Sequence, residues 1–99
     1  MLERDRYRVV EAADGASALA LAAAEQPDVV LLDVHLPDMN GFEVAAALRR
    51  AGGSGAIVLI STHPAVDYAE QIAESAADGF IDKADLSMST ISAMLAGNA

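Results

Sequence analysis

Three polar side chains in this sequence have types that could handle a phosphoryl group. Asp33, Ser61 and Lys83 each stand at the end of a short, largely apolar run, in VVLLD, AIVLIS and GFIDK. A carboxylate can attack phosphorus, as it does in aspartyl-phosphate chemistry. A hydroxyl and an ammonium can stabilise phosphoryl oxygens through hydrogen bonds and charge. Each of these residues is on its own more often a turn or surface residue, so the chemistry requires a fold that brings them together.

The runs that precede these residues are typical of strands in a parallel sheet. Residues 28–34 contain four consecutive apolar side chains without alternation, and residues 56–60 repeat the pattern. A short, β-branched-rich run of this kind fits a strand that is buried on both faces. We expect two further short strands at 7–12 and 80–82.

The segments between the predicted strands carry helix signals. An alanine-rich stretch follows Asp14, a good helix cap, and ends before Pro27, which disfavours helix in the residue before it. Asn40 and Glu43 have the spacing of a capping box. The helices that we expect span residues 16–26, from the Asn40 cap to about Arg50, 64–77 with Gly79 as the breaker, and from the Ser87 cap to about Leu95.

The alternation of strands and helices predicts an α/β fold, a doubly wound parallel sheet with helices on both faces. Such sheets bind ligands at the carboxyl ends of their strands, near a switch point of the strand order. Asp33, Ser61 and Lys83 end three successive strands. We therefore expect all three side chains at one edge of the sheet, within a single domain of 99 residues.

Composition excludes several classes of function. The chain has no cysteine, which excludes disulfides and thiolate metal sites and favours a cytoplasmic location. Its formal net charge of −9 argues against nucleic acid and anionic membranes as partners. No apolar run reaches the roughly 18 residues of a membrane helix, and the charged start MLERDRYRVV has no signal-peptide core.

Four motifs together resemble the receiver (CheY-like) domain of two-component response regulators. They are VVLLDVHLPDMNGFEV at 29–44, AIVLIS at 56–61, GFIDK at 79–83 and VVEAADG at 9–15. The resemblance runs from about Leu2 to Leu95 and implies a flavodoxin-like fold, with no output domain in this chain. It further implies a phosphoacceptor in a phosphorelay, with a sensor histidine kinase or phosphotransfer protein as partner. Such a domain is not an ordinary enzyme; at most it catalyses Mg²⁺-dependent self-phosphorylation and autodephosphorylation.

The resemblance assigns roles to residues by position. Asp33 matches the phosphoacceptor, Lys83 the lysine that pairs with the phosphoryl group, and Ser61 the hydroxyl residue that shifts toward that group on activation. Phe80 matches the aromatic switch residue that turns inward together with Ser61. The backbone carbonyl of His35 matches a Mg²⁺ ligand, with the Asp33 carboxylate as another.

Two further positions match residues that tune phosphoryl access and the lifetime of the phosphorylated state. They are Thr62 and His63, directly after the predicted switch serine.

The sequence departs from the family pattern at two places. The family's first strand ends in an acidic pair that completes the Mg²⁺ site. Here MLERDRYRVV is similar instead to the end of the first helix running into the second strand, and Glu3 and Asp5 do not match the pair. Mg²⁺ needs at least one or two carboxylates in octahedral geometry, so we expect weak binding. Lys83-Ala84 replaces the family's Lys-Pro, and we expect a trans peptide bond there.

The absent first strand leads to an expectation about assembly. In the family order, 2-1-3-4-5, it lies between the strands that match 7–12 and 28–34. An open edge on 28–34 could be covered in two ways. Residues 7–12 could pair directly with 28–34 in a four-stranded sheet, or two chains could form a homodimer through the exposed edges. We expect the homodimer, because it leaves the alanine-rich helix in its usual path.

Other functions compete with a phosphoacceptor. A pseudo-receiver, which binds partners without being phosphorylated, would explain the missing acidic pair, whereas intact Asp33, Ser61 and Lys83 oppose it. A haloacid-dehalogenase-like phosphatase would need a second Asp where His35 stands. Zinc binding by His35 and His63 lacks supporting ligands in the sequence.

Overall fold

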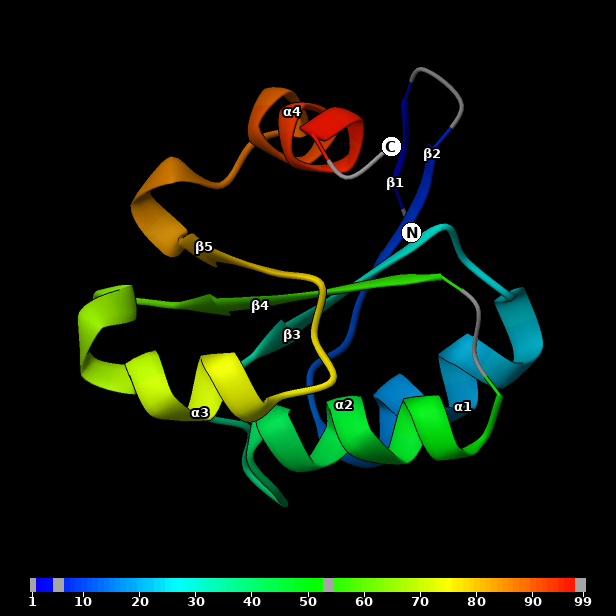
Figure 1. The fold of residues 1–99 in the computed structure, drawn as a ribbon. Helices are drawn as coiled ribbons and strands as arrows, with labels where there is room; N and C mark the ends of the chain where they lie inside the picture. Colours follow the sequence, from blue (N-terminus) through cyan, green and yellow to red (C-terminus); the bar gives the residue numbers. More distant parts are fainter. Residues whose placement is uncertain (1, 5–6, 53–54, 98–99) are drawn as a thin grey trace.

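The computed structural model describes residues 2–4, 7–52 and 55–97. Its strands form one sheet in the order β1-β2-β3-β4-β5 (Figure 1). The strands are β1 (Leu2–Arg4), β2 (Tyr7–Glu11), β3 (Val29–Asp33), β4 (Ala56–Ser61) and β5 (Gly79–Asp82). The helical elements are α1 (Gly15–Glu25), α2 (Gly41–Arg50), the 3₁₀ turn η1 (Ala65–Tyr68), α3 (Ala69–Glu74), the 3₁₀ turn η2 (Lys83–Asp85) and α4 (Met88–Gly97).

Strands β2 to β5 are parallel, and their register aligns the ends that carry the candidate residues. Asp33 at the end of β3 lies opposite Ile60, one residue before Ser61 in β4. Ser61 in turn lies opposite Asp82, one residue before Lys83. The predicted α/β fold with a parallel sheet is therefore confirmed, and the three strand ends meet at one edge.

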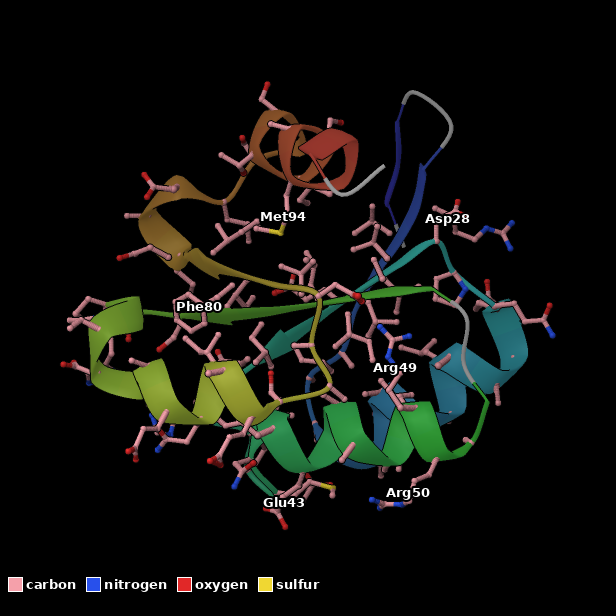
Figure 2. All side chains as sticks on the ribbon, in the orientation of Figure 1. Asp28, Glu43, Arg49, Arg50, Phe80 and Met94 are labelled. Atoms are coloured by element: carbon pink, nitrogen blue, oxygen red, sulfur yellow. The ribbon has the colours of Figure 1, made fainter. Side chains whose placement is uncertain are left out.

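Helices cover both faces of this sheet, with a separate apolar core under each. On one face lie α1, α2 and α3, over a core that includes Val30, Leu32 and Leu59 (Figure 1). On the other face lies α4, whose Ile91 is buried and whose Met94 points to the sheet (Figure 2). The central strand β3 is buried on both faces, as its uninterrupted apolar run predicts.

The predicted helix caps of α1 and α2 are also confirmed. The Asp14 carboxylate accepts a hydrogen bond from the backbone N–H of Ser17 at 2.7 Å. Asn40 and Glu43 form both bonds of a capping box, at 2.8 and 3.2 Å. Helix α1 ends at Glu25, and its C-cap Gln26 adopts a left-handed conformation (φ 46°) just before Pro27.

The segment 64–77 differs from the single long helix that we expect. It holds the turn η1 and then only six residues of α-helix, and Gly79 begins β5 rather than ending a helix. Ser75 explains the early stop, because its hydroxyl donates to the carbonyl of Ile72 at 2.9 Å and accepts from the N–H of Ala77 at 3.2 Å. A serine side chain that bonds nearby backbone competes with the helix.

The N-terminal segment also differs from its prediction. Leu2–Arg4 is a strand antiparallel to β2, not the end of a helix. Strand β2 pairs directly with β3, with Val9 opposite Val29 and Glu11 opposite Leu31. The structure thus adopts the direct pairing that we considered less favourable, and the open edge of β3 on which the expected homodimer depends is occupied.

The described residues contain no cis peptide bond, so the Lys83-Ala84 bond is trans, as expected. None of the helices in these ranges is long and apolar enough to span a membrane.

Candidate functional site

The candidate site lies where β3, β4 and β5 end. Lys83, the first residue after β5, places its Nζ 2.6 Å from Oδ2 of Asp33. Asp82, the last residue of β5, accepts a hydrogen bond from the N–H of Ala84 at 3.0 Å and so fixes the turn that carries Lys83. Ser61 is almost fully buried beside them at the end of β4, with 1% of its surface exposed. The fold therefore brings together the three residues that the sequence singles out.

Asp33 is held in its charged form. Its Oδ1 accepts the backbone N–H of His35 at 3.0 Å, while Oδ2 faces Lys83. Partial burial acts to raise the pKa of Asp33, but the bonds from Lys83 and His35 outweigh it, so the pKa lies below its ordinary value of 3.8. The carboxylate is consequently an anion at neutral pH, which is the nucleophilic form.

Lys83 is stabilised as a cation by the same contact. Its hydrogen bond to Asp33 raises the pKa of Lys83 above the ordinary 10.5, and the nearby carboxylate of Glu11 adds to the effect. Glu11 ends β2, which reaches this edge because β2 pairs directly with β3. The ammonium is therefore available to pair with other anions that bind at this edge.

Ser61 is oriented by the loop that follows it. Its Oγ accepts the backbone N–H of His63 at 3.0 Å. A hydroxyl that accepts one hydrogen bond still has its own proton to donate. Thr62 and His63 themselves are exposed, as loop residues at the rim of the site.

A cluster of rings, which we call the Tyr68 cluster, borders the site. It comprises Tyr68 and the rings of His35, Phe42, His63 and Phe80, whose centroids lie 6.0 to 6.3 Å from that of Tyr68. The Tyr68 hydroxyl and Nε2 of His35 are 2.8 Å apart and share a hydrogen bond. Phe80 lies on the side of the sheet that faces α3 (Figure 2). Tyr68 could not be identified from the sequence, since one aromatic residue in a predicted helix carries no functional signal.

Asp38 is a second residue whose role could not be predicted from the sequence. It lies in the loop between β3 and α2, and its two carboxylate oxygens accept the backbone N–H groups of Gly15 and Ala16 at 2.7 and 3.1 Å. These donors are at the start of α1, so Asp38 ties the loop after Asp33 to that helix. The only signal in the sequence is an acidic residue in a turn, which is too common to be informative.

The described residues do not fit the Mg²⁺ ion that the family resemblance implies. Within the described ranges, no three His, Cys, Asp or Glu side chains gather as a metal site would require. Both oxygens of Asp33 are already engaged, by Lys83 and by the N–H of His35. Magnesium binds through carboxylate and carbonyl oxygens in octahedral geometry, and the two engaged oxygens of Asp33 do not offer such a set.

Comparison with known proteins gives a consistent result. A family model described as "Response regulator receiver domain" matches residues 1–96. The transcriptional regulatory protein NarL of Mycobacterium tuberculosis is 43% identical over 89 residues, which cover 88% of this chain and 40% of that protein. The DNA-binding transcriptional activator EvgA of Escherichia coli K12 is 31% identical over 83 residues, which cover 84% of this chain and 41% of that protein.

A solved structure agrees with these sequence matches. The two-component response regulator of the LuxR family from Aurantimonas sp. SI85-9A1 superposes with a TM-score of 0.74 at 32% identity, over 87% of this chain and 64% of that chain. The present chain spans about two fifths of the two transcriptional regulators that it matches.

Proposed function

The chain belongs to the family of response regulator receiver domains, and from that premise we propose that Asp33 accepts a phosphoryl group from a sensor histidine kinase or phosphotransfer protein. One carboxylate oxygen of Asp33 attacks phosphorus, the bond from phosphorus to the donor histidine breaks, and the product is an acyl phosphate. The chain is then a phosphoacceptor in a two-component phosphorelay, located in the cytoplasm, and not an enzyme with a separate substrate.

The observation that carries this proposal is the ion pair between Asp33 and Lys83 at the edge of the sheet, 2.6 Å long, beside the buried Ser61. When Asp33 is phosphorylated, one of its carboxylate oxygens becomes the bridging oxygen of the acyl phosphate, a mixed anhydride. The ammonium of Lys83 then pairs with the phosphoryl oxygens, which carry about −1.5 to −2 charge. The Ser61 hydroxyl donates to the same oxygens.

In this proposal, Phe80 and Ser61 change position together when Asp33 is phosphorylated. Phosphorylation draws Ser61 toward the phosphoryl group, and the Phe80 ring moves into the space that Ser61 leaves. Phe80 is only partly buried and packs at the rim of the larger core, beside Tyr68. A phosphorylated structure in which Phe80 keeps its position would contradict this coupling.

The experiment is a labelling assay with matched carboxylate variants. Wild type, Asp33→Asn and Asp82→Asn are incubated with radiolabelled acetyl phosphate or a phosphorylated histidine kinase domain, with and without Mg²⁺. Asp82 is the matched control because it ends the neighbouring strand β5, and asparagine at this position keeps the side-chain oxygen that accepts the N–H of Ala84. We expect acid-stable, base-labile label on wild type and Asp82→Asn, and none on Asp33→Asn. Equal labelling of wild type and Asp33→Asn would refute the proposal.

A pseudo-receiver remains the second candidate, and the poor fit of the described residues to Mg²⁺ favours it. The same assay separates the two functions. A pseudo-receiver stays unlabelled under every condition and still binds a partner protein, with equal affinity for wild type and Asp33→Asn. We do not propose nucleic-acid binding by residues 1–99, because their net charge is −9. The regulators NarL and EvgA extend well beyond the part that this chain matches.

A further inference from the structure

The Tyr68 cluster joins two loops that each hold one side chain of the candidate site. The loop after β3 contains His35, whose backbone N–H binds Oδ1 of Asp33 at 3.0 Å. The loop after β4 contains His63, whose backbone N–H binds Oγ of Ser61 at 3.0 Å. The two imidazole rings meet edge to face, with centroids 5.7 Å apart. Both loops thus bring a ring to the same rim of the site.

Tyr68 is the residue at which these contacts converge. It ends η1 and is partly buried, and its ring contacts the rings of both histidines and of Phe80. Its hydroxyl fixes the His35 ring through the 2.8 Å bond to Nε2. His35 is otherwise an exposed loop residue. The hydroxyl of Tyr68 therefore restricts the rotation of the His35 ring, and the backbone N–H of His35 donates a hydrogen bond to Asp33.

We propose that Tyr68 is a positioning residue, which holds the His35 ring at the rim of the Asp33 site and thereby slows hydrolysis of the acyl phosphate. The proposal rests on the phosphorylation of Asp33 proposed above. It assigns the hydroxyl of Tyr68 a role in the lifetime of the signal, in addition to the packing of its ring.

The chemistry explains why ring position matters. In hydrolysis a water oxygen attacks phosphorus, the bond between phosphorus and the Asp33 oxygen breaks, and the products are inorganic phosphate and the free carboxylate. The attacking and leaving oxygens lie roughly in line, so water must approach from the solvent side of the phosphoryl group. Two imidazole rings held together at that rim occupy part of the approach. A His35 ring released from Tyr68 rotates into solvent and leaves more room for water.

The same structure suggests a simpler role, in which Tyr68 only packs against Phe42 and Phe80. The two roles make different demands on the side chain. Packing needs the ring, and Phe in place of Tyr keeps it. Positioning needs the hydroxyl, which Tyr68→Phe removes while leaving the ring contacts at 6.1 Å available.

The test measures the decay of labelled protein after the donor is removed, for wild type, Tyr68→Phe, His35→Ala and the double variant. Tyr7→Phe is the matched control, because Tyr7 is the other tyrosine of the chain. We expect the half-life to fall about two- to tenfold in Tyr68→Phe, the range that corresponds to one lost hydrogen bond, and to stay unchanged in Tyr7→Phe. Melting curves of all variants check that each one is folded.

The double variant tests whether Tyr68 acts through His35. If it does, Tyr68→Phe adds no further loss in a His35→Ala background, because interacting residues are not additive. Equal half-lives of wild type and Tyr68→Phe overturn the proposal, and so does a full additional loss in the double variant. Absence of label on wild type overturns the phosphoacceptor function itself, which distinguishes the two failures.

Discussion

Asp38 shows how one side chain can connect the loop of the candidate site to a distant helix. Two of the first backbone N–H groups of α1 bind its carboxylate, and Asp14 binds a third, that of Ser17. The first N–H groups of a helix have no partner within the helix and carry partial positive charge. The loop after Asp33 is therefore anchored to α1 by charge and hydrogen bonds together.

This anchor predicts a pH dependence of stability. The N–H group of Gly15 lowers the pKa of Asp38 below its ordinary value of 3.8 in the folded chain. A carboxylate with a depressed pKa stabilises the fold above the unfolded pKa, and loses that contribution as pH falls through the folded pKa. We therefore expect Asp38→Asn, which keeps one acceptor oxygen, to melt below wild type at pH 7.

The difference in melting temperature between wild type and Asp38→Asn should shrink on acidification below about pH 4. Thermal melts from pH 7 to pH 2.5 measure it, and Glu43→Gln, which alters a carboxylate at the start of α2, serves as the comparison. A difference that stays constant over this pH range would show that the charge of Asp38 is unimportant.

At the scale of single residues, contacts between residues close in the sequence could be predicted, and contacts between distant residues could not. Asp14 and Asn40 bind N–H groups three residues away, so the sequence alone identifies them as caps. Asp38 and Tyr68 bind partners 22 to 33 residues away. Such contacts depend on how the loops lie in space, and no residue type or spacing encodes them. The meeting of Asp33, Ser61 and Lys83 at one edge was predictable because each ends or directly follows a strand of a recognisable parallel sheet.

At the scale of elements, Arg49 joins α2 to the residues that precede β4 and β5, at the edge of the sheet opposite the candidate site. Figure 2 shows Arg49 pointing from α2 toward the sheet and Arg50 pointing away from it. The Arg49 guanidinium donates to the carbonyl oxygens of Gly55 and Ala76, at 3.0 and 3.3 Å, and forms an ion pair with Asp78. Asp78 also accepts the backbone N–H of Ile57 at 2.8 Å, which fixes the start of β4.

This arrangement predicts a difference between two adjacent arginines. Lysine keeps the charge but cannot reproduce several bonds from a planar guanidinium. We expect Arg49→Lys to lower the free energy of unfolding by about 1 to 2 kcal/mol, and Arg50→Lys to change it by less than about 0.5 kcal/mol. Urea unfolding measures both variants. Equal effects would mean that the Arg49 contacts do not contribute to stability.

The elements themselves were predictable where the local signal is clear. Strands β3 and β4 have an uninterrupted apolar run, and helices α1 and α2 have an N-cap residue. Their observed bounds differ from the prediction by one residue or so. The segment 64–77 has only an approximate helical spacing, and the hydroxyl of Ser75 ends the helix early. The sequence of Leu2–Arg4 gives no strand signal of its own. That short strand exists because the outer edge of β2 offers unpaired backbone groups.

At the scale of the whole molecule, direct pairing of β2 with β3 decides the arrangement of the sheet. Strand β3 is buried on both faces, so its backbone groups need partners on both edges. Strand β4 supplies one set, and β2 supplies the other through Val9, Val10 and Glu11. The resemblance to the family predicts a gap at this place, because it maps residues onto a known strand order. It does not reveal that the neighbouring strand can close the gap.

The edge strands of the sheet determine whether chains associate, and they reverse the expectation of a homodimer. The outermost strands of the described sheet are β1, with three residues, and β5, with four. Short edge strands are poor templates for pairing with another chain. We therefore expect the 99-residue chain to remain monomeric over a wide range of concentration, with the mass of 10.2 kDa in light scattering or sedimentation.

A shortened chain provides the contrast. Deletion of residues 1–6 removes β1 and leaves the outer edge of β2 unpaired, along a strand that includes Val9 and Val10. We expect this version to fold and to associate as its concentration rises, because an open strand edge recruits another strand. Circular dichroism and melting curves check that both versions are folded. If the full chain is a dimer even at low concentration, or if the shortened chain is as monomeric as the full one, then β1 does not protect the sheet edge and the direct pairing of β2 with β3 does not determine the assembly.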